Sequence, residues 1–355
     1  IIMIDKNFWR SKKVFLTGHT GFKGSWLSLW LLNLGAKLKG YSLEPNTNPS
    51  LYNSLKLNEN IESDIKDIRN FDEIKKSMTS FNPDVLFHMA AQPLVRDSYK
   101  DPLYTFETNI MGTANLLEVC KFCSNLKTII IVTTDKCYEN DERSSAYIET
   151  DAMGGKDPYS ASKGCAELVT SSYRNSFLKE IKKGISSVRA GNVIGGGDWS
   201  KDRLIPDILR SFEEGKKLSI RNPNAIRPWQ YVLEPLCGYL MLAQNLYEDF
   251  ENFSTPFNFG PNIYDSKSVE WIVKKMSNYW PSSQWDTFVN DSLAESQHLT
   301  LNADKAKKLL KWEPKVHLEE SLYKIYKWHM EFKTDPNKII DFSINEIEEY
   351  ETRLK

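Results

Sequence analysis

The chain has 355 residues, enough for one large or two modest domains, and its 12% aromatic content supports a buried core. Its 46 Lys and Arg residues balance 47 Asp and Glu residues, which argues against general binding of nucleic acid or membrane surfaces. No apolar run approaches the roughly 20 residues needed to cross a bilayer. No signal peptide is recognisable, so we expect Met3 to be the natural start of a cytoplasmic protein.

The five cysteines are scattered and odd in number, which favours free thiols over a disulfide framework. Cys120 and Cys123 form a lone Cys-x-x-Cys with no second pair, so we expect neither a zinc site nor any other metal. Reduced thiols agree with a cytoplasmic location.

A glycine-rich turn dominates the start of the chain. The apolar run 14–16 predicts a buried strand, glycines follow with the spacing Gly-x-x-Gly-x-x-Gly, and a helical pattern extends over 25–34. In this context glycines let the backbone approach a pyrophosphate, and the helix N-terminus presents free N–H groups to it. The dinucleotide contacts expected from this turn are Gly18, Thr20, Gly21, Phe22, Lys23 and Gly24.

A second strand is predicted over 37–43. Many NAD enzymes carry an acidic residue at the end of this strand, where it binds the adenosine ribose. Here Ser42 occupies that place, and no basic residues follow to hold a 2′-phosphate. The pattern favours NAD over NADP, but this position alone leaves both open.

Further cofactor contacts are expected after the next two strands. Asp67 precedes a helix predicted over 71–81 and either binds the adenine amino group or stabilises the helix start. A strand over 85–88 leads into small residues that let a cofactor lie against the backbone. Asn109, on a helix expected over 105–123, either supports a proton relay or satisfies a buried backbone group. The contacts expected here are Asp67, Ile68, Ala90, Ala91, Gln92, Asn109 and Thr133.

Polar side chains follow the most β-branched run of the chain, 128–132, which predicts a central parallel strand. Ligands of open α/β sheets bind beyond the carboxyl ends of strands, so Thr134, Asp135 and Lys136 are candidates for chemistry. A helix over 159–177 opens with Tyr159 and Lys163, which share one helix face. A lysine ammonium beside a phenol lowers the phenol's pKa and makes it a base. The polar stretch between strand and helix, 138–156, has the composition of a lid.

These motifs, in this order, resemble the extended short-chain dehydrogenase/reductase family, and within it the nucleotide-sugar 4,6-dehydratases. The resemblance extends from about residue 8 to about residue 328. The blocks that carry it are 17–26, 88–96, 134–138, 189–199, 202–207 and 227–230.

The resemblance implies an α/β fold with a Rossmann-type doubly wound parallel sheet and a smaller, mostly helical C-terminal substrate domain. Residues 1–188 are expected to form the NAD-binding domain, with 229–262 returning to it. Residues 189–355 are expected to form mainly the nucleotide-sugar-binding domain. By analogy with the family, we expect a homodimer or homotetramer.

The activity implied by the resemblance is that of a lyase in deoxysugar biosynthesis that converts CDP-D-glucose to CDP-4-dehydro-6-deoxy-D-glucose and water. NAD would take a hydride from C4 while Tyr159 takes the hydroxyl proton. The C4 ketone acidifies the C5 proton, water leaves from C6, and the hydride returns to C6. Thr134 would bond the C4 oxygen, Lys163 would hold the nicotinamide ribose, and Asp135 would protonate the departing hydroxyl.

Lys136 stands where the dTDP-glucose branch of the family has a glutamate that removes the C5 proton. A neutral lysine would act as that base, and a charged lysine would instead stabilise the enolate, so both roles stay open.

The second half of the chain supplies candidate substrate contacts. Guanidinium groups bind diphosphate with paired donors, which is one interpretation of Arg203 and Arg227; ion pairs with protein carboxylates are the other. The remaining contacts rest on the resemblance. Together the expected substrate contacts are Arg96, Asn192, Trp199, Arg203, Arg227 and His298.

Three alternatives remain beside the leading interpretation. A 4,6-dehydratase acting on a UDP- or dTDP-linked sugar stays open, because no residue reads cytosine by its chemistry alone. A nucleotide-sugar 4-epimerase would share Tyr159 and Lys163 but needs no proton donor such as Asp135. A non-catalytic NAD-binding regulator is disfavoured because Tyr159 and Lys163 are both present.

Overall fold

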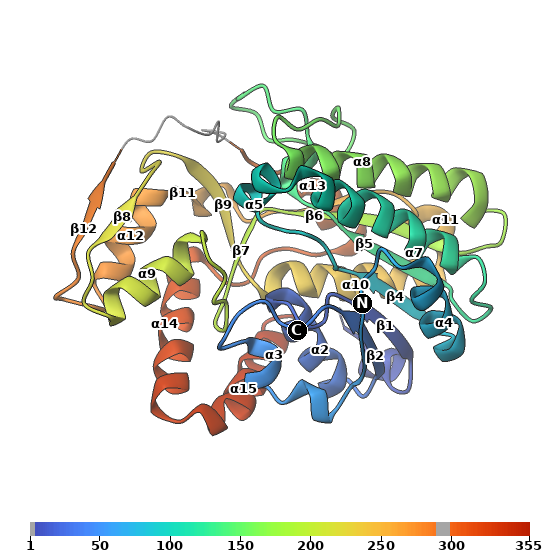
Figure 1. Ribbon diagram of the computed structural model, residues 1–355, viewed down its shortest axis with the longest axis horizontal. Helices are drawn as coiled ribbons and strands as arrows, with labels where there is room; N and C mark the ends of the chain where they lie inside the picture. Colours follow the sequence, from blue (N-terminus) through green and yellow to red (C-terminus); the bar gives the residue numbers. More distant parts are fainter. Residues whose placement is uncertain (1–3, 289–298) are drawn as a thin grey trace.

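A seven-stranded parallel sheet forms the centre of the molecule (Figure 1). The computed structural model describes residues 4–288 and 299–355. In space the strands follow the order β10-β6-β5-β4-β1-β2-β3, so the order reverses between β1 and β4. At such a switch point the open α/β sheets bind their ligands. The strands are β1 (Lys13–Thr17), β2 (Lys37–Ser42), β3 (Glu62–Ile65), β4 (Val85–His88), β5 (Thr128–Val132), β6 (Gly184–Ala190) and β10 (Phe257–Phe259).

Helices flank this sheet and build a second lobe (Figure 1). They are α1 (Lys6–Trp9), α2 (Phe22–Asn33), α3 (Leu51–Ser54), α4 (Phe71–Phe81), α5 (Val95–Lys100), α6 (Pro102–Phe106), α7 (Gly112–Cys120), α8 (Pro158–Tyr173), α9 (Leu204–Glu213), α10 (Leu233–Glu248), α11 (Phe250–Phe253), α12 (Val269–Ser277), α13 (Asp304–Leu310), α14 (Leu318–Thr334) and α15 (Ile339–Thr352). Short π-helical or 3₁₀ segments are η1 (Leu57–Glu59), η2 (Glu107–Met111), η3 (Asp135–Cys137), η4 (Arg174–Leu178), η5 (Ile263–Asp265) and η6 (Pro336–Lys338).

Two apolar cores lie on opposite faces of the sheet, because side chains of a strand alternate between its faces. On β5, Ile130 and Val132 face the core shared with α2, α10 and α15, whereas Ile129 and Ile131 face the core shared with α4 and α7. This double burial explains why the strand is a continuous apolar run. The helix expected over 105–123 is divided into α6, the π-helical η2 and α7.

The second lobe combines small sheets with helices. One sheet has the order β11-β9-β7, and β12 pairs with β8. Helices α9, α12 and α14 enclose their own apolar core beside these strands. The strands are β7 (Asn192–Ile194), β8 (Leu218–Ile220), β9 (Ile226–Tyr231), β11 (Ser266–Ser268) and β12 (Trp285–Thr287).

The C-terminal helix α15 extends from the second lobe to pack against α2. Trp30 on α2 donates a hydrogen bond of 2.9 Å to Glu351, and Tyr350 donates one of 2.7 Å to the buried Glu234 on α10. The last helix of the chain therefore packs against the helix that follows the glycine-rich turn. None of the helices in the described ranges is long and apolar enough to cross a membrane.

Candidate active site

A cavity of about 760 Å³ lies at the carboxyl ends of the central strands. Its walls come from the loops after β1, β2, β4 and β5, from the start of α8 and from the second lobe. Most of the predicted contacts meet here. Those lining it are Gly18, Thr20, Gly21, Phe22, Lys23, Gly24, Asp67, Ile68, Ala90, Ala91, Gln92, Arg96, Thr133, Thr134, Lys136, Tyr159, Lys163, Asn192, Arg203 and Arg227.

The glycine-rich turn forms a tight cradle. Gly18 has φ +76°, and a Cβ there would lie 2.6 Å from the Ala90 nitrogen. A Cβ at Gly24 would lie 2.1 Å from the carbonyl oxygen of Gly18. Helix α2 begins at Phe22, and its N-cap, Gly21, makes no side-chain capping bond. The first N–H groups of α2 are therefore not capped by a side chain, and the arrangement fits the pyrophosphate of a dinucleotide.

A sharp prediction follows for this cradle. We expect Gly24→Ala to weaken NAD binding at least about tenfold (about 1.4 kcal/mol), because a Cβ 2.1 Å from the Gly18 carbonyl oxygen would displace the turn that receives the pyrophosphate. Gly238→Ala on α10 is the matched control, since its Cβ would lie 2.2 Å from the Phe259 ring, away from the cavity, and should lower stability without changing NAD affinity. Thermal unfolding without NAD and calorimetric titration with NAD measure the two effects. Unchanged NAD affinity in Gly24→Ala would contradict the proposed role of the cradle.

Neutral groups occupy the end of β2. The Thr20 and Ser42 hydroxyls lie 2.9 Å apart, and Thr20 also donates to the carbonyl oxygen of Leu43. Further along the wall, burial acts to raise the pKa of Asp67, but hydrogen bonds from Arg69 hold that pKa below its ordinary value. A carboxylate at this edge of the cavity can accept a bond from an adenine amino group.

Asn109 lies behind the cavity wall rather than on it. Its side chain accepts a 2.8 Å bond from the Gln92 backbone N–H and donates to the Gln92 carbonyl at 3.1 Å. It also donates to Ser162 on α8 at 2.8 Å. Of the two roles considered for Asn109, satisfying buried backbone is the one that these contacts match, and the residue thereby ties the loop after β4 to α8.

Tyr159 and Thr134 meet at the end of β5. Burial raises the pKa of Tyr159 to about 12, whereas a hydrogen bond with Thr134 and the charge of Arg203 act to lower it. The expected lowering of this pKa by Lys163 is not found in the chain alone. The Lys163 ammonium instead donates a 3.2 Å bond to the carbonyl oxygen of Val132.

Burial is also the main influence on the pKa values of the two lysines of the site, Lys163 and Lys23. It lowers the pKa of Lys163 to about 8, against the opposing charge of Glu167 on the next helical turn. It lowers the pKa of Lys23 to about 7, and the neighbouring charges of Lys163 and Arg203 act in the same direction. These cations make the centre of the cavity attractive to a ligand with a diphosphate.

Asp135 and Lys136 form a pair beside the phenol. The Asp135 carboxyl is buried, accepts a 3.0 Å bond from Thr134 and lies 3.7 Å from the Lys136 ammonium. Its second oxygen is buried and has no hydrogen-bond partner among the described residues. Lys136 lines the cavity, whereas Asp135 lies just beneath its surface.

The second lobe presents the candidate substrate contacts. Arg203 pairs with Asp198 at 3.1 Å and Arg96 with Asp202 at 3.3 Å, so both arginines hold protein carboxylates while facing the cavity. The side-chain oxygen of Asn192 is buried without a hydrogen bond from any described residue.

Two of the predicted substrate contacts are not placed at the cavity. Trp199 packs against Trp328 and Phe332 and does not line it. His298 lies outside the described residues.

Two residues near the site were missed by sequence reasoning. Arg221 follows β8, lines the cavity and lies 3.6 Å from Asp202, and no local pattern marks it. Glu167 lies beneath Lys163, and its spacing was a usable signal, because Tyr159, Lys163 and Glu167 follow one another at four-residue intervals on α8.

A glycine cradle at a sheet switch point, with Thr134, Tyr159 and Lys163 at the neighbouring strand end, defines an extended short-chain dehydrogenase/reductase. The chain belongs to the GDP-mannose 4,6 dehydratase family, whose model matches residues 15–325. It is 54% identical over 333 residues to a CDP-glucose 4,6-dehydratase of Salmonella typhimurium, covering 92% of this chain and 93% of that protein.

Solved structures share the fold. A dTDP-glucose 4,6-dehydratase of Bacillus anthracis in complex with NAD matches with a TM-score of 0.74 at 21% identity, over 91% of this chain and 98% of that one. The epimerase Mth375 of Methanothermobacter thermautotrophicus matches with a TM-score of 0.79 at 21% identity, over 95% of this chain and 98% of that one. At these identities the likeness supports the Rossmann-type fold and nothing finer.

Proposed function

We propose that the chain is an NAD-dependent CDP-glucose 4,6-dehydratase, a lyase that converts CDP-D-glucose to CDP-4-dehydro-6-deoxy-D-glucose and water. The 54% identity to the Salmonella enzyme supports this substrate. The observation that carries the reaction type is the position of Asp135 and Lys136 next to Thr134, at the strand end that faces Tyr159. A dehydration of this kind needs groups that assist hydride transfer at C4 and an acid–base pair that acts at C5 and C6 of the same sugar. This strand end brings Tyr159 for the first next to Asp135 and Lys136 for the second.

The residues of the redox step act on the C4 hydroxyl. NAD, when bound, supplies reversible hydride transfer at C4 and C6. Thr134 orients the C4 oxygen and Tyr159 removes its proton. That step requires a lower phenol pKa than about 12, so the positive charge of Lys163 and of the nicotinamide must act on Tyr159 in the complex. Lys163 also binds the nicotinamide ribose.

The residues of the elimination step act at C5 and C6. The C4 ketone makes the C5 proton acidic, and Lys136 removes that proton or stabilises the enolate. The buried carboxyl of Asp135 protonates the C6 hydroxyl, which departs as water. Arg203 and Arg227 bind the diphosphate, and Asn192 bonds the sugar or the diphosphate.

The experiment that tests the proposal is incubation of the purified protein with CDP-glucose, UDP-glucose, dTDP-glucose and GDP-mannose in separate reactions. Each product is weighed by mass spectrometry. We expect loss of one water from CDP-glucose alone. Loss of water from another donor would overturn the nucleotide, and an isomer of unchanged mass would place the protein among the 4-epimerases.

We also propose a homodimer or homotetramer assembled through the helices around α8. Leu103 on α6, Met111 on η2 and Leu168 on α8 are large apolar side chains left 72%, 55% and 61% exposed. Elements α6, η2 and α8 pack together, so these side chains lie on three neighbouring elements, and we take them as one apolar face. An apolar face of this kind fits a second copy of the chain, with matched helices from each protomer.

We expect Leu168→Glu to convert the assembly to monomers, because it places a charge in the apolar centre of that face. Light scattering after size-exclusion chromatography measures the mass. Leu309→Glu on α13 is the control, since Leu309 is also exposed but lies on another part of the chain. An unchanged mass for Leu168→Glu would reject this interface.

The proposed domain division follows the chain. Residues 1–188 form the NAD-binding domain, residues 229–262 with α10 and β10 return to it, and α15 packs against it, so 189–355 forms mainly, not wholly, the nucleotide-sugar-binding domain. The location we propose is the cytoplasm, in agreement with five cysteines that are all free thiols.

A further inference from the structure

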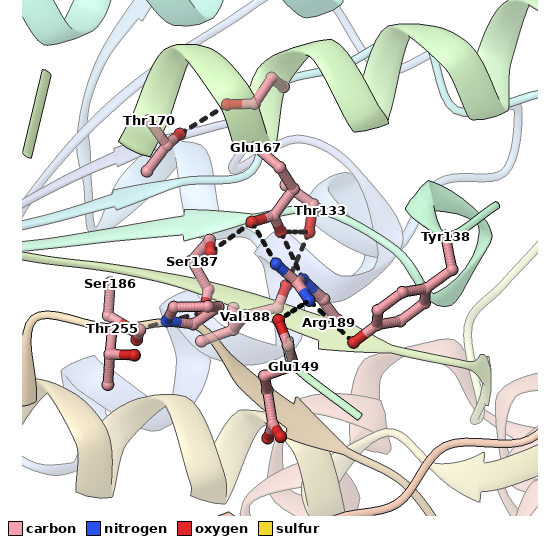
Figure 2. Close-up of polar contacts among 12 residues, drawn as sticks. Thr133, Tyr138, Glu149, Glu167, Thr170, Ser186, Ser187, Val188, Arg189 and Thr255 are labelled. Atoms are coloured by element: carbon pink, nitrogen blue, oxygen red, sulfur yellow. Dashed lines mark hydrogen bonds and ion pairs between the residues drawn. The ribbon is translucent and has the colours of Figure 1, made fainter. Parts of the chain in front are cut away.

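A buried ion pair joins α8 to β6 (Figure 2). Glu167 on α8 and Arg189 on β6 are 2.8 Å apart, and the side chain of each is less than 5% exposed. Neither lines the cavity, so neither touches the substrate. Burying two charges is costly unless every polar atom is paired, so such a pair calls for a physical account.

The carboxylate of Glu167 is fully engaged. It accepts hydrogen bonds from the Thr133 hydroxyl at 2.5 Å, from the Ser187 hydroxyl at 2.6 Å and from two nitrogens of Arg189 at 2.9 and 2.8 Å. Its donors come from the ends of two adjacent strands, β5 and β6. Figure 2 shows these groups converging on the carboxylate from both strands. The carboxylate is therefore fixed in position and held in its ionised form.

Arg189 extends the same network to the catalytic loop. Its guanidinium donates to the Tyr138 hydroxyl at 2.8 Å and to the carbonyl oxygen of Glu149 at 3.1 Å. Tyr138 in turn donates to Asn258 on β10 at 2.7 Å. The segment that begins with Thr134 and Asp135 is thus anchored at Thr133 by Glu167 and at Tyr138 by Arg189.

Glu167 also lies one helical turn below Lys163, at a spacing that places Cβ atoms about 5–6 Å apart. Within the described part of the chain, the Lys163 ammonium donates its hydrogen bond to a neutral group, the carbonyl oxygen of Val132. The nearby negative charge for Lys163 is therefore the carboxylate of Glu167, which acts to keep the ammonium protonated against burial.

We propose that Glu167 is a positioning residue of the reaction: clamped by Arg189, Thr133 and Ser187, its carboxylate is the fixed counter-charge that keeps Lys163 an ammonium and holds Tyr159 and Lys163 against the end of β5. The assignment of a catalytic benefit rests on the proposed function. The effect on the charge of Lys163 does not, because it concerns only groups of the folded chain.

The charged and titratable groups around Lys163 set the direction of the effect. Tyr159 and Glu167 lie on its own helix, Cys137 on η3, His88 on β4 and Lys23 on α2. The positive charge of Lys23 disfavours a second positive charge on Lys163. Burial keeps His88 neutral by lowering its pKa to about 3. Burial also raises the pKa of the Cys137 thiol, so Glu167 supplies the anionic charge of this set at neutral pH.

The test removes the negative charge of Glu167 and keeps the shape of its side chain. In Glu167→Gln we expect the pKa of Lys163 to fall by about one unit or more, the size of effect that a neighbouring charge exerts. NMR titration of protein labelled at the lysine Cε carbons measures this value, with Lys163→Met to assign the signal. The double variant Glu167→Gln/Arg189→Gln removes both buried charges, so it separates the pKa effect from the instability caused by an unpaired Arg189.

The catalytic readout is the pH dependence of C4 oxidation. CDP-6-deoxyglucose has no C6 hydroxyl to lose, so turnover stops after oxidation and NADH absorbance reports that step alone. Because Lys163 must be charged, a lower pKa moves the alkaline limb of the profile to lower pH. We expect this shift in both the single and the double variant, while the double variant recovers thermal stability. Glu234→Gln, another buried carboxyl that accepts three hydrogen bonds, is the control and leaves the limb unmoved.

Three results would overturn the proposal. They are an unchanged Lys163 titration in Glu167→Gln, an unmoved alkaline limb despite a lowered Lys163 pKa, and a double variant that recovers the wild-type limb together with stability. The last would mean that the pair serves folding alone. If the wild type fails to dehydrate CDP-glucose while Glu167→Gln still lowers the Lys163 pKa, the proposed function falls and the electrostatic role of Glu167 stands.

Discussion

Tyr159→Phe is expected to slow C4 oxidation by about 10³- to 10⁴-fold, near the upper end of what a positioned acid or base contributes. The substitution removes the phenol oxygen that lies beside Thr134 and leaves the aromatic ring in its buried position. NAD affinity and thermal stability should therefore stay close to those of the wild type. Single-turnover formation of NADH and the mass of the product measure the effect.

A second buried tyrosine provides the control. Tyr239 is fully buried, and its hydroxyl has no hydrogen-bond partner within the described part of the chain. Tyr239→Phe should leave the rate unchanged. A Tyr159→Phe enzyme within about tenfold of the wild type would reject Tyr159 as the base, because that loss is below what general-base catalysis supplies.

Asp135→Asn is expected to divide the reaction into its two halves. The amide keeps the shape of the carboxyl but has no acidic proton for the departing C6 hydroxyl. We expect C4 oxidation of CDP-glucose to persist and loss of water to slow by about 10²- to 10³-fold, so NADH accumulates on the enzyme. Stopped-flow absorbance follows NADH, and mass spectrometry follows the dehydrated product.

Asp265→Asn is the matched control, since Asp265 is also buried but bonds the backbone of Leu318 outside the site. It should change stability alone. If Asp135→Asn slowed oxidation and elimination equally, Asp135 would act in the first step, and its assignment to the C6 hydroxyl would be wrong.

The fold was most predictable where local signals agree with tertiary packing. Strands β4 and β5 lie within their predicted bounds because both are continuous apolar runs buried on two faces. Helix α4 also matches, and the Asn70 side chain caps it by accepting from the N–H of Glu73. Strand β3 was missed because it is a polar strand at the edge of the sheet, with no alternation to reveal it.

Helix α14 was missed although its sequence carried the pattern. Leu318, Leu322 and Ile325 recur at helical spacing and face the core of the second lobe. Aromatic and charged residues occupy the other positions of this helix, so the apolar face is not obvious from the sequence without the core that it packs against.

The site was predictable as far as its motifs extend. The positions of Thr134 and Tyr159 at the cavity, which depend on one strand end and one helix turn, could be predicted from spacing. The position of Trp199 was not, because α14 brings Trp328 and Phe332 against it from far along the chain. The charge on Lys163 likewise depends on Glu167 and on burial, which spacing alone does not measure.

The docking of α15 on α2 has a consequence for how the protein is made. The glycine-rich turn and α2 are translated long before α15, so Trp30 and Glu234 meet their partners Glu351 and Tyr350 only after residues 339–352 have left the ribosome. Strand β10, which closes the far edge of the sheet, is also translated late. A polypeptide that ends before residue 339 therefore leaves the part of α2 that α15 covers, around Trp30, exposed to solvent.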